Sequence, residues 1–393
     1  MSKLDELIAE LCPNGVSFLP LKDITSINKG IQFNKSEMFD EGTYPVINGG
    51  INPSGYIEQY NQDKDTITIS QGGASAGYVN WIGTEFWAGA HCYVLKPSDK
   101  VLNRFLFHFI KSKEYKLQEC QYGAGIPALA KSTVEELRLP VPPLEVQREI
   151  VRVLDNFTFL TAELTAELTA RRKQYDYYRN RLFIFDDETD NKILELGSIA
   201  KVTKLAGFEF TKYVQYSNEG KVIALRGLNV KDGRLVLNDV KYIDKSDFSK
   251  LERSKLRIDD MLFTYVGTVG QVALIDKNDK YYLAPNVALI RIENKNIIPK
   301  FLMYYFQTSI FKDNEINRLQ QSSPMKNIPM EKIRRFKVPV PSIETQKRVI
   351  TFLDNFDAVC NDISIGLPAE IAARQKQYEY YRDKLLTFKE LNA

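Results

Sequence analysis

The sequence predicts an α+β protein in which two similar mixed α/β domains are separated by two long, antiparallel, coiled-coil-like helices. Two segments occur twice in the same order, and a helical pattern of apolar residues runs through each copy. Each copy is also preceded by a stretch of short predicted strands. At 393 residues the chain is too long for one ordinary domain. We therefore expect an internal duplication with pseudo-twofold symmetry.

Two pairs of matching segments define the duplication. PVPPLEVQREIVRVLDNF at 140–157 matches PVPSIETQKRVITFLDNF at 339–356, with nine of 18 positions identical at an offset of 199. RRKQYDYYRNRLF at 171–183 matches RQKQYEYYRDKLL at 374–386, with eight of 13 identical at an offset of 203. The second copy has therefore gained four residues between the two matches.

The repeats set the expected domain boundaries. The stretch before each repeat contains short predicted strands such as Thr66–Ser70 and Ala288–Ile292, and it ends in matching helical segments at 103–107 and 299–303. We predict a first globular domain over 1–143, a first spacer helix over 144–185, a second globular domain over 186–342 and a second spacer helix over 343–393.

Each spacer helix begins after Pro-Val-Pro, which can continue neither a helix nor a central strand. Apolar residues then recur at steps of three, four and seven, the pattern of helices that pair along a seam. Extended over 145–183, the first helix is about 55–60 Å long. The residues expected to pair the helices or contact partners are Gln147, Leu154, Phe157, Leu164, Leu168, Tyr175, Tyr178, Gln346, Leu353, Phe356, Tyr378 and Tyr381.

A tetrapeptide repeat, TAEL-TAEL, occupies 161–168 of the first helix. Four residues are close to one helical turn, so each unit lengthens the helix by about 6 Å while nearly keeping its face. The second copy has Gly366-Leu367-Pro368 in this region, and the proline predicts a kink or a restart of the helix.

Glycine-rich turns occur at corresponding places in the two globular domains, at 71–77 and 267–270. Neither fits a phosphate-binding glycine motif, and hairpin turns are the favoured interpretation over a ligand role. A later polar or glycine-containing loop follows in each domain, at 122–127 and 318–327.

Candidate catalysts are scarce. His91 and His108 have no visible third partner and are interpreted as packing residues. The four cysteines have neither the spacing of a zinc site nor the number expected of a disulfide framework. Asn52-Pro53-Ser54-Gly55 lacks the second proline and the aromatic residue of an adenine methyltransferase motif. We predict that this chain has no catalytic residue and binds no metal or cofactor.

The polar loops instead favour binding, because Asn and Gln can contact adenine edges while Arg and Lys suit guanine and phosphate. The residues expected to contact DNA are Asn48, Gln71, Ser75, Lys131, Arg226, Tyr265, Thr268, Asn286, Gln321, Ser322, Ser323 and Lys326. The net charge, 53 − 50 = +3, is too small for a protein that coats nucleic acid by charge alone. With no signal peptide and no apolar run long enough to span a membrane, we expect a cytoplasmic protein.

The motifs resemble the specificity subunits of type I restriction–modification systems. The resemblance is based on Leu139-Pro140-Val141-Pro142, Gln147 and Leu154-Asp155, and on Lys173-Gln174-Tyr175 with Tyr177-Tyr178-Arg179, all of which recur in the second copy. The TAEL units look like those of the subgroup in which their number sets the DNA spacer. The resemblance covers essentially the whole chain.

The resemblance implies two target recognition domains, each binding one half of a bipartite, asymmetric duplex DNA sequence. The helices would then act as a spacer and dock two modification (methyltransferase) subunits, with restriction and translocation subunits joining the complex. S-adenosylmethionine, ATP and Mg²⁺ would be bound by those partners. The alternative is a two-lobed scaffold on a coiled coil that binds no DNA. An enzyme with an unrecognised site is a third possibility.

Overall fold

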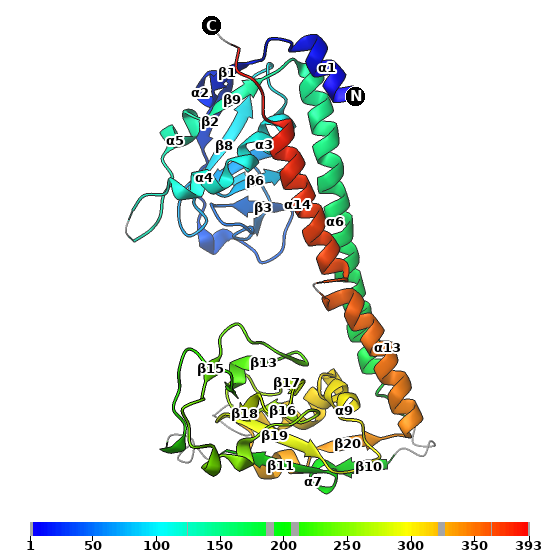
Figure 1. Ribbon diagram of the computed structural model, residues 1–393. Helices are drawn as coiled ribbons and strands as arrows, with labels where there is room; N and C mark the ends of the chain where they lie inside the picture. The colour runs from blue at the N-terminus through cyan, green and yellow to red at the C-terminus, as the bar shows by residue number, and fades with distance from the viewer. Residues whose placement is uncertain are drawn as a thin grey trace. The chain divides into compact units, whose positions relative to one another are not determined.

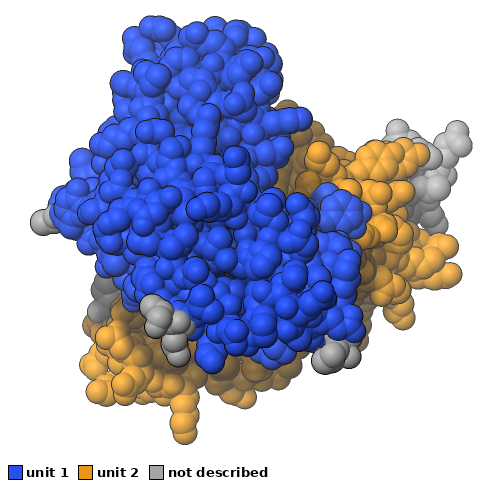
Figure 2. Space-filling view, turned by 90° about the horizontal axis from the view of Figure 1, so that it is seen from above, with its two compact units in different colours: residues 1–166, 369–393 blue, residues 167–368 orange. Residues whose placement is uncertain are grey.

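The computed structural model describes residues 3–123, 125–185, 192–205, 212–320, 327–362 and 364–391. The chain divides into two compact units (Figure 2). Unit 1 contains residues 1–166 and 369–393, whereas unit 2 is the continuous segment 167–368. Unit 1 is therefore built from two separate stretches of the chain.

Unit 1 contains a four-stranded sheet in the order β2-β8-β5-β6 and a three-stranded sheet in the order β4-β3-β7 (Figure 1). Strand β5 is buried along its whole length, as its β-branched sequence TITIS suggests. The elements are α1 (Lys3–Leu11), β1 (Ser17–Pro20), α2 (Leu21–Ile24), β2 (Thr25–Lys29), η1 (Lys35–Glu37), β3 (Tyr44–Ile47), β4 (Tyr56–Ile57), β5 (Thr66–Ser70), β6 (Val79–Ile82), β7 (Trp87–Ala88), β8 (Cys92–Pro97), α3 (Asn103–Ser112), α4 (Glu114–Glu119), α5 (Lys131–Glu135) and β9 (Arg138–Val141).

Unit 2 repeats this topology with sheets in the orders β11-β19-β16-β17 and β15-β12-β18. Its elements are β10 (Lys192–Glu195), α7 (Leu196–Ile199), β11 (Ala200–Lys204), β12 (Ile223–Leu225), η2 (Gly227–Asn229), β13 (Val230–Lys231), β14 (Arg234–Leu235), β15 (Lys241–Tyr242), η3 (Phe248–Lys250), η4 (Glu252–Ser254), β16 (Met261–Thr264), β17 (Val272–Leu274), β18 (Tyr281–Leu283), β19 (Val287–Ile292), α9 (Pro299–Phe306), α10 (Ser309–Phe311), η5 (Lys312–Asn317), α11 (Arg318–Gln320), α12 (Met330–Arg334) and β20 (Lys337–Val340).

The strand registers make the two units comparable residue by residue. In unit 1, Ile47 of β3 pairs with Ala88 of β7 in a parallel ladder, and in unit 2 Leu225 of β12 pairs in the same way with Leu283 of β18. The antiparallel pairs β2–β8 and β11–β19 also correspond. Lys29 lies opposite Tyr93 in unit 1, and Lys204 lies opposite Ala288 at the equivalent place in unit 2. Equivalent positions in the two units can therefore be identified without reference to side-chain identity.

The spacer helices are α6 (Leu144–Arg181), α13 (Ile343–Asn361) and α14 (Leu367–Leu385). The first 23 residues of α6 belong to unit 1 with most of α14, and the remainder belongs to unit 2 with α13 (Figure 1). Ring contacts between Tyr175 and Phe356 and between Tyr178 and Phe352 run in opposite chain directions, so the pairing in unit 2 is antiparallel. The predicted fold class is confirmed, including the break before Pro368.

The glycine-rich turns also lie where the sequence placed them. The loop 71–77 joins the antiparallel strands β5 and β6, and 267–270 joins β16 and β17, so both are hairpin connections. Within the described residues no helix is long and apolar enough to cross a membrane.

Candidate nucleic-acid interface

Three loops meet at the end of the strands in unit 1. Asn48 follows β3, Gln71 follows β5 and His91 precedes β8, and hydrogen bonds bring the three residues together. The Gln71 amide donates to the His91 carbonyl at 2.8 Å, and the His91 amide donates to Asn48 Oδ1 at 3.2 Å. We call Asn48, Gln71 and His91 loop cluster 1.

Glycine at position 49 permits this close approach. Gly49 has a φ of 87°, a region that side chains disfavour, and a Cβ there would lie 2.6 Å from the His91 carbonyl oxygen. The Ser70 hydroxyl donates to the Gly49 carbonyl at 2.7 Å and fixes the loop to β5. The hydrogen bonds of the loop backbones therefore hold the cluster in one geometry.

The equivalent three loops meet in unit 2, where Arg226 follows β12, Tyr265 follows β16 and Asn286 precedes β19. The Tyr265 amide donates to the Asn286 carbonyl, as Gln71 does to His91. Tyr265 also accepts from the Ile328 amide at 2.9 Å, as Gln71 does from Leu129 at 2.8 Å. We call Arg226, Tyr265 and Asn286 loop cluster 2, which occupies the positions equivalent to loop cluster 1.

Loop cluster 2 borders a cavity of about 470 Å³. Arg226, Thr268 and Asn286 line it together with apolar surface from residues such as Leu228 and Val266. Arg226 is half-buried, and its guanidinium donates to the backbone and carboxylate oxygens of Asp239, both at 2.9 Å. This ion pair holds the donor face of Arg226 in place.

The remaining expected DNA contacts are distributed as follows. Ser75 lies in the β5–β6 hairpin loop beside Gln71. Lys131 is exposed at the start of α5, two residues after Leu129, and its ammonium group forms an ion pair with Glu135 at 3.0 Å. Gln321, Ser322, Ser323 and Lys326 lie outside the described residues.

His91 is the residue that the sequence interpretation missed. Its assignment to packing is wrong, because the residue is exposed. No local motif marks His91. Its role as a neighbour of Asn48 follows from a parallel strand pairing over more than 40 residues of chain, and the equivalence with Asn286 is visible only in the strand register.

One buried glutamine attaches each spacer helix to its globular domain. Gln147 is completely buried: its Oε1 accepts from the Leu102 amide at 2.9 Å, and its Nε2 donates to the carbonyls of Lys100 at 3.0 Å and Pro142 at 2.8 Å. Gln346, the other glutamine among the expected pairing residues, is also completely buried. The structure thus places both glutamines between helix and domain.

Gln346 makes the equivalent three bonds in unit 2. Its Oε1 accepts from the Ile298 amide at 2.8 Å, while its Nε2 donates to the carbonyls of Asn296 at 2.8 Å and Pro341 at 2.9 Å. Because a primary amide supplies both an acceptor and two donors, only Asn or Gln can satisfy three such backbone groups.

An aspartate about two turns further along each helix forms a second attachment. In unit 1, Asp155 Oδ1 accepts from Arg104 Nε at 2.7 Å and from His108 Nε2 at 2.8 Å, and His108 Nδ1 contacts the Tyr378 hydroxyl at 2.9 Å. Since a carboxylate only accepts, Nε2 carries the proton, and in the neutral ring Nδ1 accepts from Tyr378. His108 therefore has two hydrogen-bonding partners that the sequence did not reveal.

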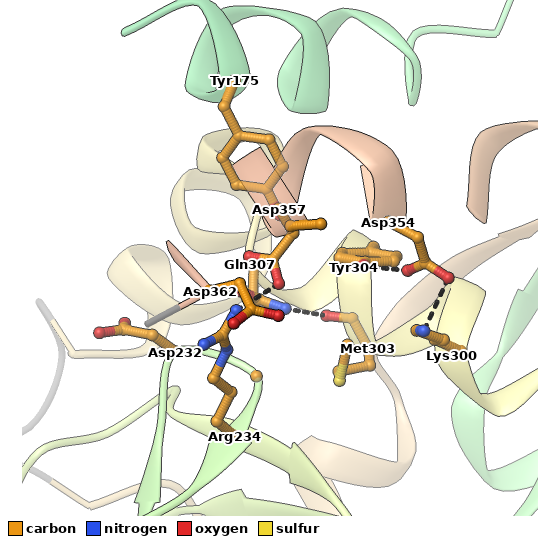
Figure 3. Close-up of a pocket in the computed structure, with 12 residues that line it drawn as sticks. Tyr175, Asp232, Arg234, Lys300, Met303, Tyr304, Gln307, Asp354, Asp357 and Asp362 are labelled. Carbon is orange, nitrogen blue, oxygen red and sulfur yellow. Dashed lines mark hydrogen bonds and ion pairs between the residues drawn. The ribbon is translucent and has the colours of Figure 1, made fainter. Parts of the chain in front are cut away.

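Unit 2 keeps this arrangement with different side chains (Figure 3). Lys300 and Tyr304 donate to Asp354 at 2.7 and 2.5 Å, and Tyr304 takes the place of His108. These three side chains line a cavity of about 370 Å³. Tyr175 of α6 lines it too, near Asp357, which forms an ion pair with Arg234. We call Asp155 or Asp354 with its hydrogen-bonding side chains the node of its unit. Each node joins a domain helix, α3 or α9, to a spacer helix, α6 or α13.

The other predicted pairing residues lie along the helix contacts. Leu154 and Leu353 are completely buried, and Tyr378 and Tyr175 are nearly so. Phe157 stacks on Tyr381 in unit 1 with ring centroids 5.3 Å apart, and Phe356 contacts both Tyr175 and Tyr178 in unit 2. Leu168 packs partly buried against the unit 2 core, and Leu164 is half-buried on the same helix.

Burial sets the ionisation of the unit 1 node. It lowers the pKa of His108, despite the opposing hydrogen bond to Asp155, and it raises the pKa of Tyr378 to about 12. Burial alone would raise the pKa of Asp155, but hydrogen bonds from His108 and Arg104 hold it below its usual value. The node is therefore a neutral histidine beside a carboxylate and a guanidinium.

This ionisation predicts that acid weakens unit 1 more than unit 2. Below about pH 6.5, His108 gains a proton in the unfolded chain but stays neutral in the folded chain, because its folded-state pKa is lower. Unit 1 therefore loses unfolding free energy as the pH falls from about 6.5 toward the folded-state pKa. The slope is at most about 1.4 kcal/mol per pH unit. Hydrogen exchange of unit-specific peptides between pH 7.5 and 5.5, corrected for intrinsic rates, measures it.

The matched variant is His108→Tyr, which copies Tyr304 of unit 2. We expect it to flatten the pH response of unit 1 and leave that of unit 2 unchanged. An unaltered response in the variant would mean that another group titrates in this window.

The chain is similar to proteins of known type. A model of the type I restriction modification DNA specificity domain matches residues 13–171 and 188–373. The EcoR124I/EcoR124II type I restriction enzyme specificity subunit of Escherichia coli is 29% identical over 411 aligned positions, which cover 99% of this chain and 97% of the relative.

Solved structures share the fold. The S subunit of a type I restriction-modification system from M. genitalium aligns with a TM-score of 0.58 at 18% identity, covering 94% of this chain and 96% of that one. A chain from a structure on complex assembly and conformational transition of the type I R-M system aligns with a TM-score of 0.60 at 14% identity, covering 95% and 98%. Because the two matches to the family model together span most of the chain, the chain belongs to the type I restriction modification DNA specificity family.

Proposed function

We propose that this chain is the DNA-recognition subunit of a type I restriction–modification complex, in which unit 1 and unit 2 each bind one half of a bipartite target. In this proposal it supplies sequence discrimination and scaffolding and performs no chemistry. Membership of the specificity family supports recognition of DNA within a complex and disfavours the scaffold that binds no DNA.

The equivalence of the two loop clusters supports an asymmetric target. Loop cluster 1 presents an amide, an amide and an imidazole where loop cluster 2 presents a guanidinium, a phenol and an amide. Asn and Gln form paired hydrogen bonds with adenine, whereas Arg does so with guanine. Two domains of one fold with different donors and acceptors at equivalent positions would bind two different half-sites.

The partners proposed are two modification subunits and the restriction subunits. The modification subunits would carry S-adenosylmethionine and methylate an adenine in each half-site, and the restriction subunits would use ATP and Mg²⁺. The E. coli relative is named as a restriction enzyme specificity subunit, which supports such an assembly. We propose that the complex acts in the cytoplasm.

Exchanging residues 1–139 for the matching domain of another family member is expected to change one half-site only. The reason is that loop cluster 1 and its supporting strands are contained in that segment. Methylome sequencing of cells that express the chimaera with the modification subunits gives the methylated motif. A reciprocal exchange of 192–338 is the control and should change the other half.

Two outcomes would contradict the proposal. A change in both halves after one exchange would exclude independent recognition by the two units. If the wild-type complex does not bind duplex DNA that carries its methylated motif, recognition of duplex DNA is excluded. The same holds if the affinity for that duplex does not depend on salt.

A further inference from the structure

Unit 2 contains a basic cavity that the recognition loops do not account for. Its volume is about 520 Å³, and it lies between β11, β19 and the segment that contains η4. Lys201 and Arg291 face each other across the β11–β19 ladder, and Thr203 faces Leu289. We call this the basic cavity; its lining residues are Lys201, Thr203, Lys204, Leu205, Glu252, Arg253, Ser254, Arg257, Leu289 and Arg291.

The charge of the basic cavity is strongly unbalanced. Five cationic side chains and one carboxylate, that of Glu252, line it. Arg291 is neutralised by the buried Asp260, to which it donates at 2.6 and 2.7 Å. Among the described residues, the side chains of Lys201, Lys204, Arg253 and Arg257 form no ion pair. Four uncompensated cations therefore gather around one carboxylate, and an anion would relieve their repulsion.

A buried hydroxyl gives an independent indication of a missing ligand. Ser254 lines the basic cavity and is only 2% exposed, yet its Oγ has no hydrogen-bond partner among the described residues. Buried hydroxyls are nearly always hydrogen-bonded, because an unsatisfied one loses its hydration without replacement. An anion oxygen in the basic cavity would be an acceptor for this donor.

Unit 1 lacks two of these cations. The strand registers place Ser26 at the position of Lys201 and Asp63 at the position of Arg257. The Ser26 hydroxyl donates to the Lys96 carbonyl at 3.4 Å, so this part of unit 1 is satisfied internally. The shared fold accepts a small residue at the first position and an acidic residue at the second, and the two cations are thus not required for folding.

We propose that the basic cavity of unit 2 binds a phosphate group. Phosphate combines the negative charge that the four cations lack with several acceptor oxygens for Ser254 and the guanidinium groups. The proposal rests on the DNA-recognition function only for the source of the phosphate. Lys204 lies 6.0 Å over the ring of Tyr265 in loop cluster 2, so a phosphodiester of the DNA backbone next to the contacted bases is the expected occupant.

The test uses the full chain in complex with the modification subunits. Lys201→Ser copies Ser26 of unit 1, and Arg257→Ser in the same variant removes the second cation. Lys277→Ala with Lys295→Ala removes two exposed lysines of unit 2 as the charge-matched control. Affinity for the methylated duplex is measured between 50 and 200 mM salt, conditions that reveal phosphate contacts. We expect the slope of log affinity against log salt to fall by about one to two in the cavity variant only.

Two further measurements separate the sources and the roles. Titration of inorganic phosphate against the chain without DNA, followed by calorimetry, shows whether free phosphate is bound: saturable binding that is lost in the cavity variant supports the site with a free phosphate as its ligand. Ser254→Ala should weaken whichever binding is found by about fivefold while leaving thermal stability unchanged or higher, because it removes an unsatisfied hydroxyl.

The inference is overturned if the cavity variant and the lysine control have equal salt slopes and equal phosphate binding. If the wild-type complex binds no specific duplex, the proposed function fails by itself, and the phosphate titration still decides the cavity. An altered methylated motif in the cavity variant would also contradict the inference, since backbone contacts carry no base preference.

Discussion

Deletion of Thr165–Leu168 is expected to abolish methylation at the native motif and to create methylation at a motif with the same half-sites and a shorter gap. The deletion removes four residues of α6, which is about 6 Å of helix and slightly more than one turn. These residues span the boundary between unit 1 and unit 2, and the three with described exposed side chains, at 165–167, contribute to neither core. Methylome sequencing in cells that supply the modification subunits gives both the half-sites and the gap.

The control keeps the length of α6 and changes its sequence. Replacing Thr165–Leu168 with four alanines preserves the helical rise and a high helix propensity. We expect this variant to methylate the native motif, with a stability loss limited to the partly buried Leu168. If deletion leaves the gap unchanged, or if the alanine variant shortens it, helix length does not determine the spacing.

The second large effect concerns the buried glutamines. Gln147→Leu leaves one amide and two carbonyls without their partners in a completely buried position, and each unsatisfied group costs about 1–3 kcal/mol. Unit 1 is expected to lose about 3–5 kcal/mol of unfolding free energy, a large part of the stability of an ordinary domain. Urea dependence of hydrogen exchange, resolved by unit, measures the loss.

Gln346→Leu is the matched variant in unit 2, and it should destabilise that unit by a similar amount because it breaks the equivalent three bonds. Gln377→Leu, on the exposed face of α14, should change neither unit by more than about 0.5 kcal/mol. Equal effects of Gln147→Leu on both units would show that they unfold together. An effect below 1 kcal/mol would mean that water replaces the lost partners.

The architecture could be predicted because its signals are local or repeated. Helix periodicity and the proline at 368 are properties of short windows, and the duplication is visible in the residues themselves. The hairpin turns at 71–77 and 267–270 follow from glycine between β-branched runs. These features depend on backbone preference and amphipathic pattern, which the chain encodes without long-range information.

The site could be predicted only in part, because its residues meet through long-range strand pairing. Asn48 and Gln71 were chosen as polar residues in loops, but their neighbour His91 was assigned to packing. Gln147 was assigned to helix pairing, since a polar residue on an apolar stripe gives no sign of three buried backbone partners. Ser254 and Arg257 lie in a segment without any motif. They come near Lys201 only through the pairing of β19 with both β11 and β16 and through the hydrogen bond from Arg291 to the Lys255 carbonyl.

The discontinuity of unit 1 has a consequence for biosynthesis. Its core includes Tyr378 and Leu386, and the partner of His108 at Nδ1 is the hydroxyl of Tyr378, 270 residues later in the chain. Unit 2 is continuous, so all of its residues leave the ribosome while unit 1 still lacks α14. The N-terminal unit, although synthesised first, therefore completes its core last, and its recognition loops gain their full support only near the end of translation.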